Sequence, residues 1–499
     1  MRNLILILQK KYGVYLYSQS GKKFIVLNNF KLYCEIISVL LLLDFVFYLP
    51  LKNIFFGLYF SKSSNQLLSF IKNIIFIVWP ILLICILFDF YRLPSSLLLA
   101  CIYRYFFIDT RWSSLLRGGG APGYMTYYSL LIILVYETSF ILPESNQVWA
   151  GFLIKIDFGV IILCSGLYKS LTGYLKSDGM EYGLANPFWS YFYSYFAKLN
   201  PKNLFFKVQN VSACLLQIIA GFCICLSPIY NFLGYLGGII VILSFIYLLP
   251  LIRLGRLSAI MMSIGILFLP NINFSFLEIS KNVIQTRDYI DNNLLNGLFK
   301  AIFLIYIPLL SVIKITQYLN LFKNIYWPFS TNIFISKVAN FLPIIVWRVF
   351  TPDVTNFYIM IRFRNKISKC THSYVDKSTY NYFPLHSFST KFRYLHVMES
   401  IVITTIFNSL RYFHNNPKLF NERLLNYSKT LPNHLDNIIT YDYMLIEKSS
   451  TNFNYTHLKS FIVDTEKESI NSIEMRKSDL ISKSSTYSPI HITHGFGHY

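Results

Sequence analysis

The chain has 499 residues, of which 54% are hydrophobic, 18% aromatic and 14% charged, and its mean hydropathy is +0.45. This composition is too apolar for an ordinary soluble protein and indicates a chain that lies in lipid. The formal charge of +21 comes from scattered lysines and arginines, without a basic patch interleaved with aromatic residues. Attraction to anionic lipid headgroups explains this charge, so we expect a lipid bilayer as partner and no nucleic acid.

The N-terminal segment, residues 1–35, combines Arg2 and several lysines with only a short apolar run. It has no cleavage site of small residues, so it does not read as a signal peptide. The first true span therefore serves as its own insertion signal. The excess of positive charge predicts that this segment is cytoplasmic.

Apolar stretches long enough to cross a bilayer follow between residues 36 and 349, where we expect about eight to nine transmembrane helices. The clearest stretches are 36–50, 74–90, 127–142, 148–171, 211–229, 233–252 and 298–315. Shorter ones, which predict half-spans or helices buried within the bundle, are 97–108, 258–270 and 333–346. The predicted fold class is an all-α polytopic membrane bundle with a small mixed α/β tail, and the predicted compartment is the cell membrane.

A loop between two of these spans, residues 109–123, contains three consecutive glycines. Their backbone freedom would allow N–H groups to face an anion, assisted by two arginines. We therefore name as candidates for binding a substrate or a cofactor Arg111, Arg117, Gly118, Gly119 and Gly120. The simpler alternative is a plain connection between helices, since no Gly-Lys-Ser/Thr follows as in a phosphate-binding loop.

Lys169 is the leading catalytic candidate, because it stands late in an apolar span, shortly after Gly166. An ionisable residue in a span is costly unless it faces the protein interior or reaches the interface. Desolvation favours the neutral form of a lysine, and a neutral lysine can serve as a general base. The alternative is that the side chain of Lys169 only extends to the headgroups, with its aliphatic stem along the helix.

Glu137, at the centre of its own span, is the second catalytic candidate. We expect it to pair with a basic group across the bundle, either in a proton relay or in a buried ion pair. The aromatic run at 186–196 predicts an interfacial helix, used for anchoring or as the entrance for a lipid-like molecule. All nine histidines fall at or after His372, so the bundle lacks imidazole ligands for haem, di-iron or intramembrane zinc chemistry.

The run Ser165-Gly166-Leu167-Tyr168-Lys169, which closes a span and precedes a Gly-rich loop, resembles the signature segment of the HTTM superfamily. This superfamily includes the vitamin K-dependent gamma-carboxylase and bacterial maturation and immunity proteins. The resemblance covers residues 30–350 and implies that Lys169 is the base that deprotonates a quinone-like cofactor or substrate. Tyr168, beside Lys169 in the sequence, is a further candidate for binding the substrate or cofactor. The carboxylase also uses a membrane histidine and a large lumenal region, both missing here, so the resemblance favours an uncharacterised bacterial or organellar branch.

The tail, residues 350–480, has no segment that could cross the bilayer, and the last residues, 481–499, are predicted to be disordered. Within the tail we expect an amphipathic helix at 398–413 and short strands at 438–446 and 458–463. No metal site is expected: the histidines and acidic residue with ligand spacing lack a further ligand set, and they are His396, Glu399, His491, His494 and His498.

Two function classes fit this sequence. The first is a membrane enzyme, resembling a carboxylase or oxidoreductase, in which Lys169 faces an enclosed cavity with Glu137, Tyr168 or Arg111 nearby. The second is a non-enzymatic maturation, immunity or transport factor whose lysine reaches the headgroups and whose core is packed without a cavity. Its partner would be a lipophilic small molecule or a peptide. The fold alone does not decide between these classes.

Overall fold

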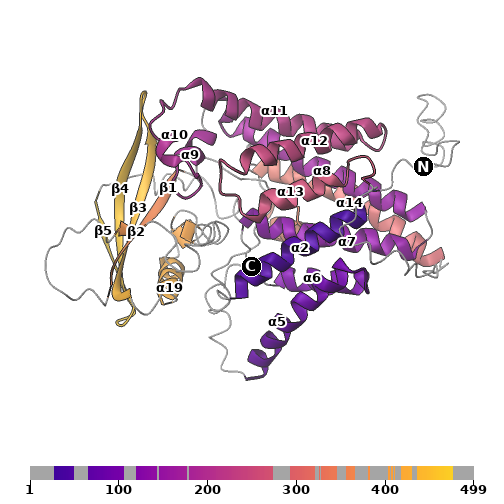
Figure 1. Cartoon of the computed structure of the whole chain (residues 1–499), viewed down its shortest axis with the longest axis horizontal. Coiled ribbons are helices and arrows are strands. Elements are labelled where there is room, and N and C mark those ends of the chain that lie inside the picture. The colour runs from indigo at the N-terminus through magenta and orange to yellow at the C-terminus, as the bar shows by residue number, and fades with distance from the viewer. Residues whose placement is uncertain are drawn as a thin grey trace.

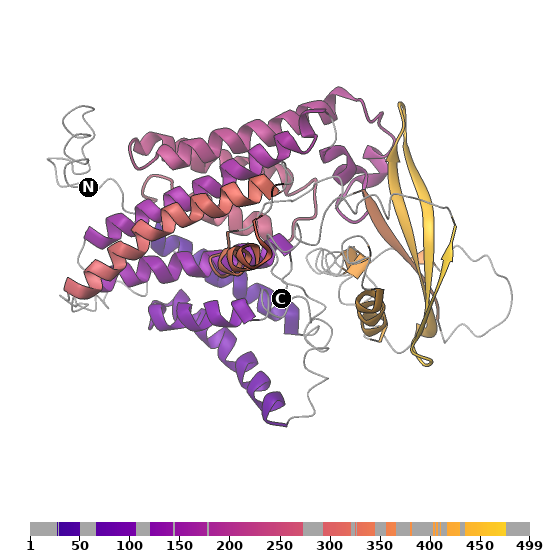
Figure 2. The same ribbon diagram turned by 180° about the vertical axis from the view of Figure 1, so that it is seen from behind.

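The computed structural model describes residues 27, 29–49, 66–105, 120–142, 145–176, 179–272, 293–320, 325, 327–344, 356–365, 380–381, 403–404, 406–407, 410, 417–429 and 435–475. Helices gather in one bundle, and an antiparallel sheet lies beyond one end of it (Figure 1). The view from behind shows the same division (Figure 2). The described part of the chain is therefore mostly helical with a small C-terminal sheet.

The bundle is built from ten longer helices and a few short elements in the described ranges. The longer helices are α2 (Phe30–Tyr48), α5 (Gln66–Leu87), α6 (Arg92–Arg104), α7 (Gly120–Ile141), α8 (Ser145–Leu171), α11 (Leu204–Leu226), α12 (Asn231–Leu248), α13 (Arg256–Ile266), α14 (Asn293–Tyr318) and α15 (Phe329–Phe341). The short elements between α8 and α11 are η4 (Tyr174–Lys176), α9 (Met180–Ala185) and α10 (Tyr193–Phe196). Every apolar stretch that the sequence predicts as a span or half-span overlaps one of the longer helices.

Five helices in the described ranges are long and apolar enough to cross a membrane. Their spanning segments are Gly123–Ile141, Asn146–Leu171, Leu204–Leu226, Asn231–Leu248 and Gly297–Tyr318. The expected total of eight to nine spans is not confirmed. The shorter stretches behave as expected, because α6, α13 and α15 have only 13, 11 and 13 residues. Large apolar side chains project outward from α11, α12 and α14, as at Phe222, Leu243 and Ile305.

Glycines let α8 and α11 approach until their backbones touch. A Cβ atom on Gly221 of α11 would lie 2.3 Å from the backbone nitrogen of Leu163 in α8. Gly159 and Gly166 lie on the same face of α8, and a Cβ atom on either would lie 2.6 or 2.8 Å from the nearest atom of α11. Small residues of this kind are typical of tightly packed membrane helices, where no hydrophobic force drives association. The two helices therefore form a fixed pair, which positions the side chains between them.

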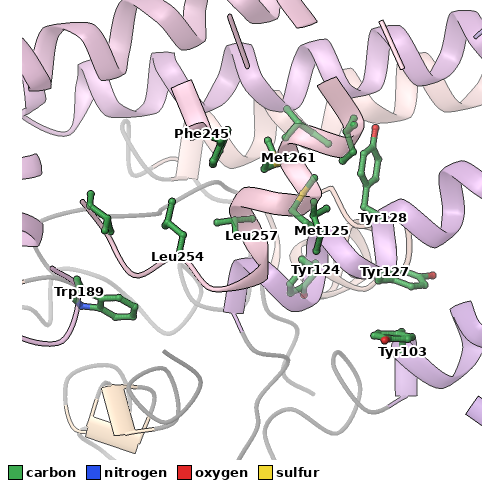
Figure 3. Close-up of a cluster of buried hydrophobic side chains, with 14 of the residues drawn as sticks. Tyr103, Tyr124, Met125, Tyr127, Tyr128, Trp189, Phe245, Leu254, Leu257 and Met261 are labelled. Atoms are coloured by element: carbon green, nitrogen blue, oxygen red, sulfur yellow. The ribbon is translucent and has the colours of Figure 1, made fainter. Parts of the chain in front are cut away.

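Part of the core of the bundle is formed by side chains from α7 and α13, which pack against each other. Met125 of α7 lies beside Leu257 and Met261 of α13 (Figure 3). Tyrosines of α6 and α7 lie next to this cluster and are buried too, among them Tyr103 and Tyr128. Buried tyrosines bring hydroxyl groups into an apolar interior, where each needs a polar partner.

The sheet has the strand order β2-β1-β3-β4-β5 and is antiparallel throughout. Its strands are β1 (Phe357–Asn365), β2 (Tyr380–Asn381), β3 (Leu435–Lys448), β4 (Phe453–Asp464) and β5 (Ser469–Glu474). β3 and β4 confirm the two strands predicted at 438–446 and 458–463. Both are longer than predicted, because they pair with each other along their full lengths, from Ile438 opposite Asp464 to Lys448 opposite Phe453.

The two faces of the sheet have different partners. On one face, Tyr441 and Tyr443 of β3 lie against Phe407, whose ring also contacts Phe420 of α19 (Pro417–Ser428). Residues 403–404, 406–407 and 410 are helical, in agreement with the amphipathic helix predicted at 398–413; the other residues of that predicted segment lie outside the described residues. On the other face, side chains reach the end of the helical bundle.

Candidate functional site

Lys169 lies in the last turn of α8 and points between α8 and α11. Its Nζ donates a hydrogen bond of 2.9 Å to Oε1 of Gln217 in α11. Ser165, one turn earlier on the same face of α8, donates from its hydroxyl to the same oxygen at 2.8 Å. Only 5% of Lys169 is exposed, so its side chain is enclosed by the protein. A serine, a lysine and a glutamine therefore meet in one buried polar group.

The ring of Tyr174 lies near the amine of Lys169. Tyr174 belongs to η4, which follows α8 after Gly173, a residue with φ of 106° that a side chain would strain. The Nζ of Lys169 is 5.9 Å from the centroid of this fully buried ring, within the range of a cation–π contact. The turn after α8 thus folds back over the lysine.

Lys169 forms no ion pair with any carboxylate in the described part of the chain. Its polar contacts there are the amide oxygen of Gln217 and the ring of Tyr174. Burying a charged amine without an opposite charge is costly, whereas a neutral amine can share a hydrogen bond with an amide at low cost. The surroundings of Lys169 therefore suit an amine that gains and loses a proton.

Glu137 lies elsewhere in the bundle. Its Oε1 accepts a hydrogen bond of 2.9 Å from Nη1 of Arg92 in α6, and both side chains are buried. Arg92 also lies 3.2 Å from Asp89. Glu137 is one turn before the end of α7, where the chain passes directly into α8. Lys169 is 24 residues beyond the start of α8, about 36 Å along its axis, so the structure does not bring the two candidates together.

The other predicted site residues are placed as follows. Tyr168 is buried next to Lys169 on α8. Gly120 begins α7, so the end of the predicted glycine loop, residues 120–123, is helical; a glycine and a proline are tolerated there because the first-turn N–H groups need no partner within the helix. Lying outside the described residues are Arg111, Arg117, Gly118 and Gly119.

Sequence reasoning missed Gln217 and Asn210, the polar residues of α11 that face the segment around Lys169. Both are amides in a helix that otherwise reads as an apolar span, and that contrast was the available signal. Asn210 is fully buried and accepts a hydrogen bond of 2.7 Å from the backbone N–H of Met180. Its amide connects α11 to the turn that follows Tyr174.

Glu181 in α9 is the centre of a second polar group, which joins the bundle to the sheet. It is fully buried, and its Oε2 accepts hydrogen bonds from the Gly179 backbone at 3.1 Å and from the Asn210 amide at 2.8 Å. Its Oε1 lies 2.8 Å from Nζ of Lys448 at the end of β3. The Lys448 ammonium also lies over the ring of Tyr182. Both carboxylate oxygens are therefore satisfied.

Further contacts hold the sheet against the same segment. The Asn186 amide donates to the Phe357 carbonyl of β1 at 2.8 Å, and the Tyr455 hydroxyl donates to the Ala185 carbonyl at 2.7 Å. Burial raises the pKa of Tyr455, so its hydroxyl keeps the proton that it donates. The ring of Phe188 packs against Tyr358 of the sheet. The helix predicted over the aromatic run at 186–196 is therefore wrong for residues 186–192, which form turns against the sheet, and only α10, Tyr193–Phe196, is helical. Its exposed rings include Tyr195.

No group of three or more histidine, cysteine, aspartate or glutamate side chains that could hold a metal occurs in the described ranges. The predicted histidine clusters of the tail, at 396–399 and 491–498, lie outside them. Comparisons with protein-family models, with curated proteins and with solved structures found no match for this chain. The likeness to the HTTM superfamily remains a prediction from residues 165–169.

Proposed function

We propose that the chain is an integral, multi-pass protein of the cell membrane with eight or nine spans. Five helices with the length and apolarity of spans support this proposal. α2 and α5, with 19 and 22 residues, are further candidates, because each is long enough to cross most of a hydrocarbon core of about 30 Å. The outward apolar side chains of α11, α12 and α14 would then face lipid.

We further propose that Lys169 is the general base of a membrane enzyme that acts on a lipophilic, quinone-like substrate, as in HTTM-type carboxylases. The observation that supports this most directly is the burial of Lys169 against an amide. No carboxylate among the described residues pairs with the amine and keeps it protonated. A neutral Nζ has a lone pair, and Gln217 fixes its position through a hydrogen bond. Ser165 in turn fixes the amide oxygen of Gln217.

In this mechanism Nζ accepts a proton from an acidic hydroxyl of the substrate. The substrate O–H bond breaks, an N–H bond forms, and the electron pair stays on the substrate oxygen, which becomes a phenolate-type anion. The lysine becomes an ammonium, whose charge the ring of Tyr174 and the amide of Gln217 stabilise. The apolar surroundings exclude water, which would otherwise protonate the phenolate-type anion again.

The test uses purified full-length protein in lipid vesicles in aerated buffer with a reduced naphthoquinone as probe. Dioxygen takes two electrons from the deprotonated quinol and becomes peroxide, and the quinone that forms is followed by absorbance. We expect activity in the wild type and its loss in Lys169→Ala and Lys169→Arg, since an arginine stays charged and does not act as a base. Lys176→Ala is the matched control, because it removes an exposed lysine seven residues away. If Lys169→Arg retains activity while folding normally, Lys169 is not a base.

A non-enzymatic maturation, immunity or transport factor is the second candidate. It is favoured by the position of Glu137, which lies in an ion pair with Arg92 far from Lys169 rather than beside it. In such a protein the bundle is a binding scaffold for a peptide or a lipophilic molecule, and the lysine stabilises its structure. A folded wild type that leaves the quinol unchanged, together with reduced thermal stability of Lys169→Ala, would support this candidate.

A further inference from the structure

Asp157 places a carboxyl group in the interior of the bundle, far from both ends of α8. It lies 12 residues after the start of this 27-residue helix, about 18 Å along an axis of about 40 Å. Only 7% of the residue is exposed. An ionised carboxylate at such a depth is expensive unless an opposite charge or a proton neutralises it. The groups around Asp157 therefore decide whether its carboxyl group is ionised or protonated.

Tyrosines from two neighbouring helices surround Asp157. The hydroxyls of Tyr128 in α7 and Tyr306 in α14 both interact with its carboxyl group. The ring of Tyr128 also stacks on Phe158, 6.4 Å away, which keeps the tyrosine against α8. Tyr306 and Val160, which is one turn beyond Asp157 on α8, pack against the same small core cluster. The carboxyl group therefore meets hydroxyl groups rather than a cation.

Two buried oxygen atoms in this cluster lack a hydrogen-bond partner among the described residues. Oδ1 of Asp157 and the hydroxyl oxygen of Tyr128 are both buried, and neither has a hydrogen-bond partner of good geometry among the described residues. A carboxylate oxygen only accepts hydrogen bonds, whereas a protonated one also donates. A proton on Oδ1 would let Asp157 donate to the Tyr128 oxygen, while Tyr306 donates to the other carboxyl oxygen.

The charged and titratable groups around Asp157 do not replace this proton. Lys314 of α14 acts on Asp157 electrostatically, but the two form no ion pair within 4 Å. Cys225 of α11 and Cys164 of α8 are the thiols of the surroundings. Lys155, two residues before Asp157, is turned away from it by about 160° around the helix. Asp157 thus has no ion pair with any residue in the described ranges.

We propose that Asp157, Tyr128 and Tyr306 form a proton-binding site within the membrane bundle, distinct from the site around Lys169. The ligand is a single proton: it binds to Oδ1 of the Asp157 carboxylate and gives a neutral carboxylic acid. Its release leaves an anion within the electrostatic influence of Lys314. The proposal does not depend on catalysis by Lys169.

Infrared spectroscopy of the full-length protein in lipid films at neutral pH tests this proposal. We expect the carbonyl stretching band of a protonated carboxylic acid in the wild type and a loss of intensity in Asp157→Asn. Asp442→Asn is the control, because Asp442 of β3 pairs with Arg362 and should contribute no such band. A spectrum in which Asp157→Asn loses no intensity would overturn the proposal.

Tyr306→Phe keeps the test decisive if Asp157→Asn does not fold. Removing one hydrogen bond from a protonated carboxyl group shifts its carbonyl band to higher frequency without abolishing it. A hydrophobic carbodiimide, which reacts with protonated buried carboxyl groups, should in addition label Asp157 in the wild type, as detected by mass spectrometry. An unchanged band in Tyr306→Phe together with an unlabelled Asp157 would show an ionised carboxylate and refute the site.

Discussion

Lys448 of β3 and Glu181 of α9 are separated by 267 positions in the sequence, yet their charged groups lie 2.8 Å apart. Glu181 is fully buried, and its second oxygen is bound to the Gly179 backbone and to Asn210 of α11. Gly179 also lies against the ring of Tyr174, which covers Lys169. A continuous set of contacts therefore leads from the end of α8 to the sheet.

Lys448→Ala should loosen the sheet from the bundle. Removal of the lysine leaves a buried carboxylate without its counter-ion, which costs about 3 kcal/mol. Hydrogen exchange of the backbone amides of β3 and β4, measured in lipid nanodiscs, should become faster while exchange in α8 and α11 stays unchanged. Lys467→Ala is the matched control, since the Lys467 side chain is 81% exposed and its Nζ lies 3.9 Å from Asp464. Equal exchange in the two variants would contradict the role given to Lys448.

Gly221→Ala should disrupt the pairing of α8 and α11. The added Cβ would overlap the Leu163 backbone, which cannot rotate away, and overpacking of this kind costs about 1–3 kcal/mol. Gly297→Ala in α14 is the control, because nothing lies within 4 Å of its Cβ position and alanine stabilises a helix by about 1 kcal/mol relative to glycine. In thermal unfolding in detergent, the melting temperature of Gly221→Ala should lie below that of the wild type, and that of Gly297→Ala should lie above it. Similar stabilities would mean that α8 and α11 can move apart freely.

The buried ion pair between Asp44 of α2 and Arg256 of α13 should tolerate joint replacement better than single replacement. Asp44→Leu or Arg256→Met alone leaves a buried charge without this counter-ion, at a cost of about 3–5 kcal/mol. The double variant leaves no charge and should recover most of that stability, so the two effects should be strongly non-additive. The folded yield and melting temperature of the four proteins measure this coupling. Additive losses would show that the two side chains do not depend on each other.

The helices could be predicted from the sequence because each buries or exposes a long apolar stretch, and apolar length is a local property of the chain. The positions of β3 and β4 could also be predicted from a local pattern, the alternation of their side chains. The strand β1 could not, since it becomes a strand only by pairing with β3, about 80 residues further along. Long-range pairing of this kind leaves no local pattern.

The candidate site could be predicted only in part. Lys169 stands out as a charge in an apolar run, and its burial agrees with a position inside the protein. Its partner Gln217 depends on which face of α11 meets α8, and that is decided by the close approach at Gly221. Likewise, the partner of Glu137 is Arg92, at the start of a short helix that the sequence predicts only weakly.

The contacts between the sheet and the bundle limit which domain exchanges this protein can tolerate. Contacts from Glu181, Ala185, Asn186 and Phe188 all reach the strands, so this part of the chain fits the sheet as closely as it fits the helices. A chimera that exchanges residues 356–475 for a foreign domain should fold only when residues 179–190 travel with it. Natural variants of the sheet are expected to carry matching changes in that short segment, even though the gene separates the two by more than 150 codons.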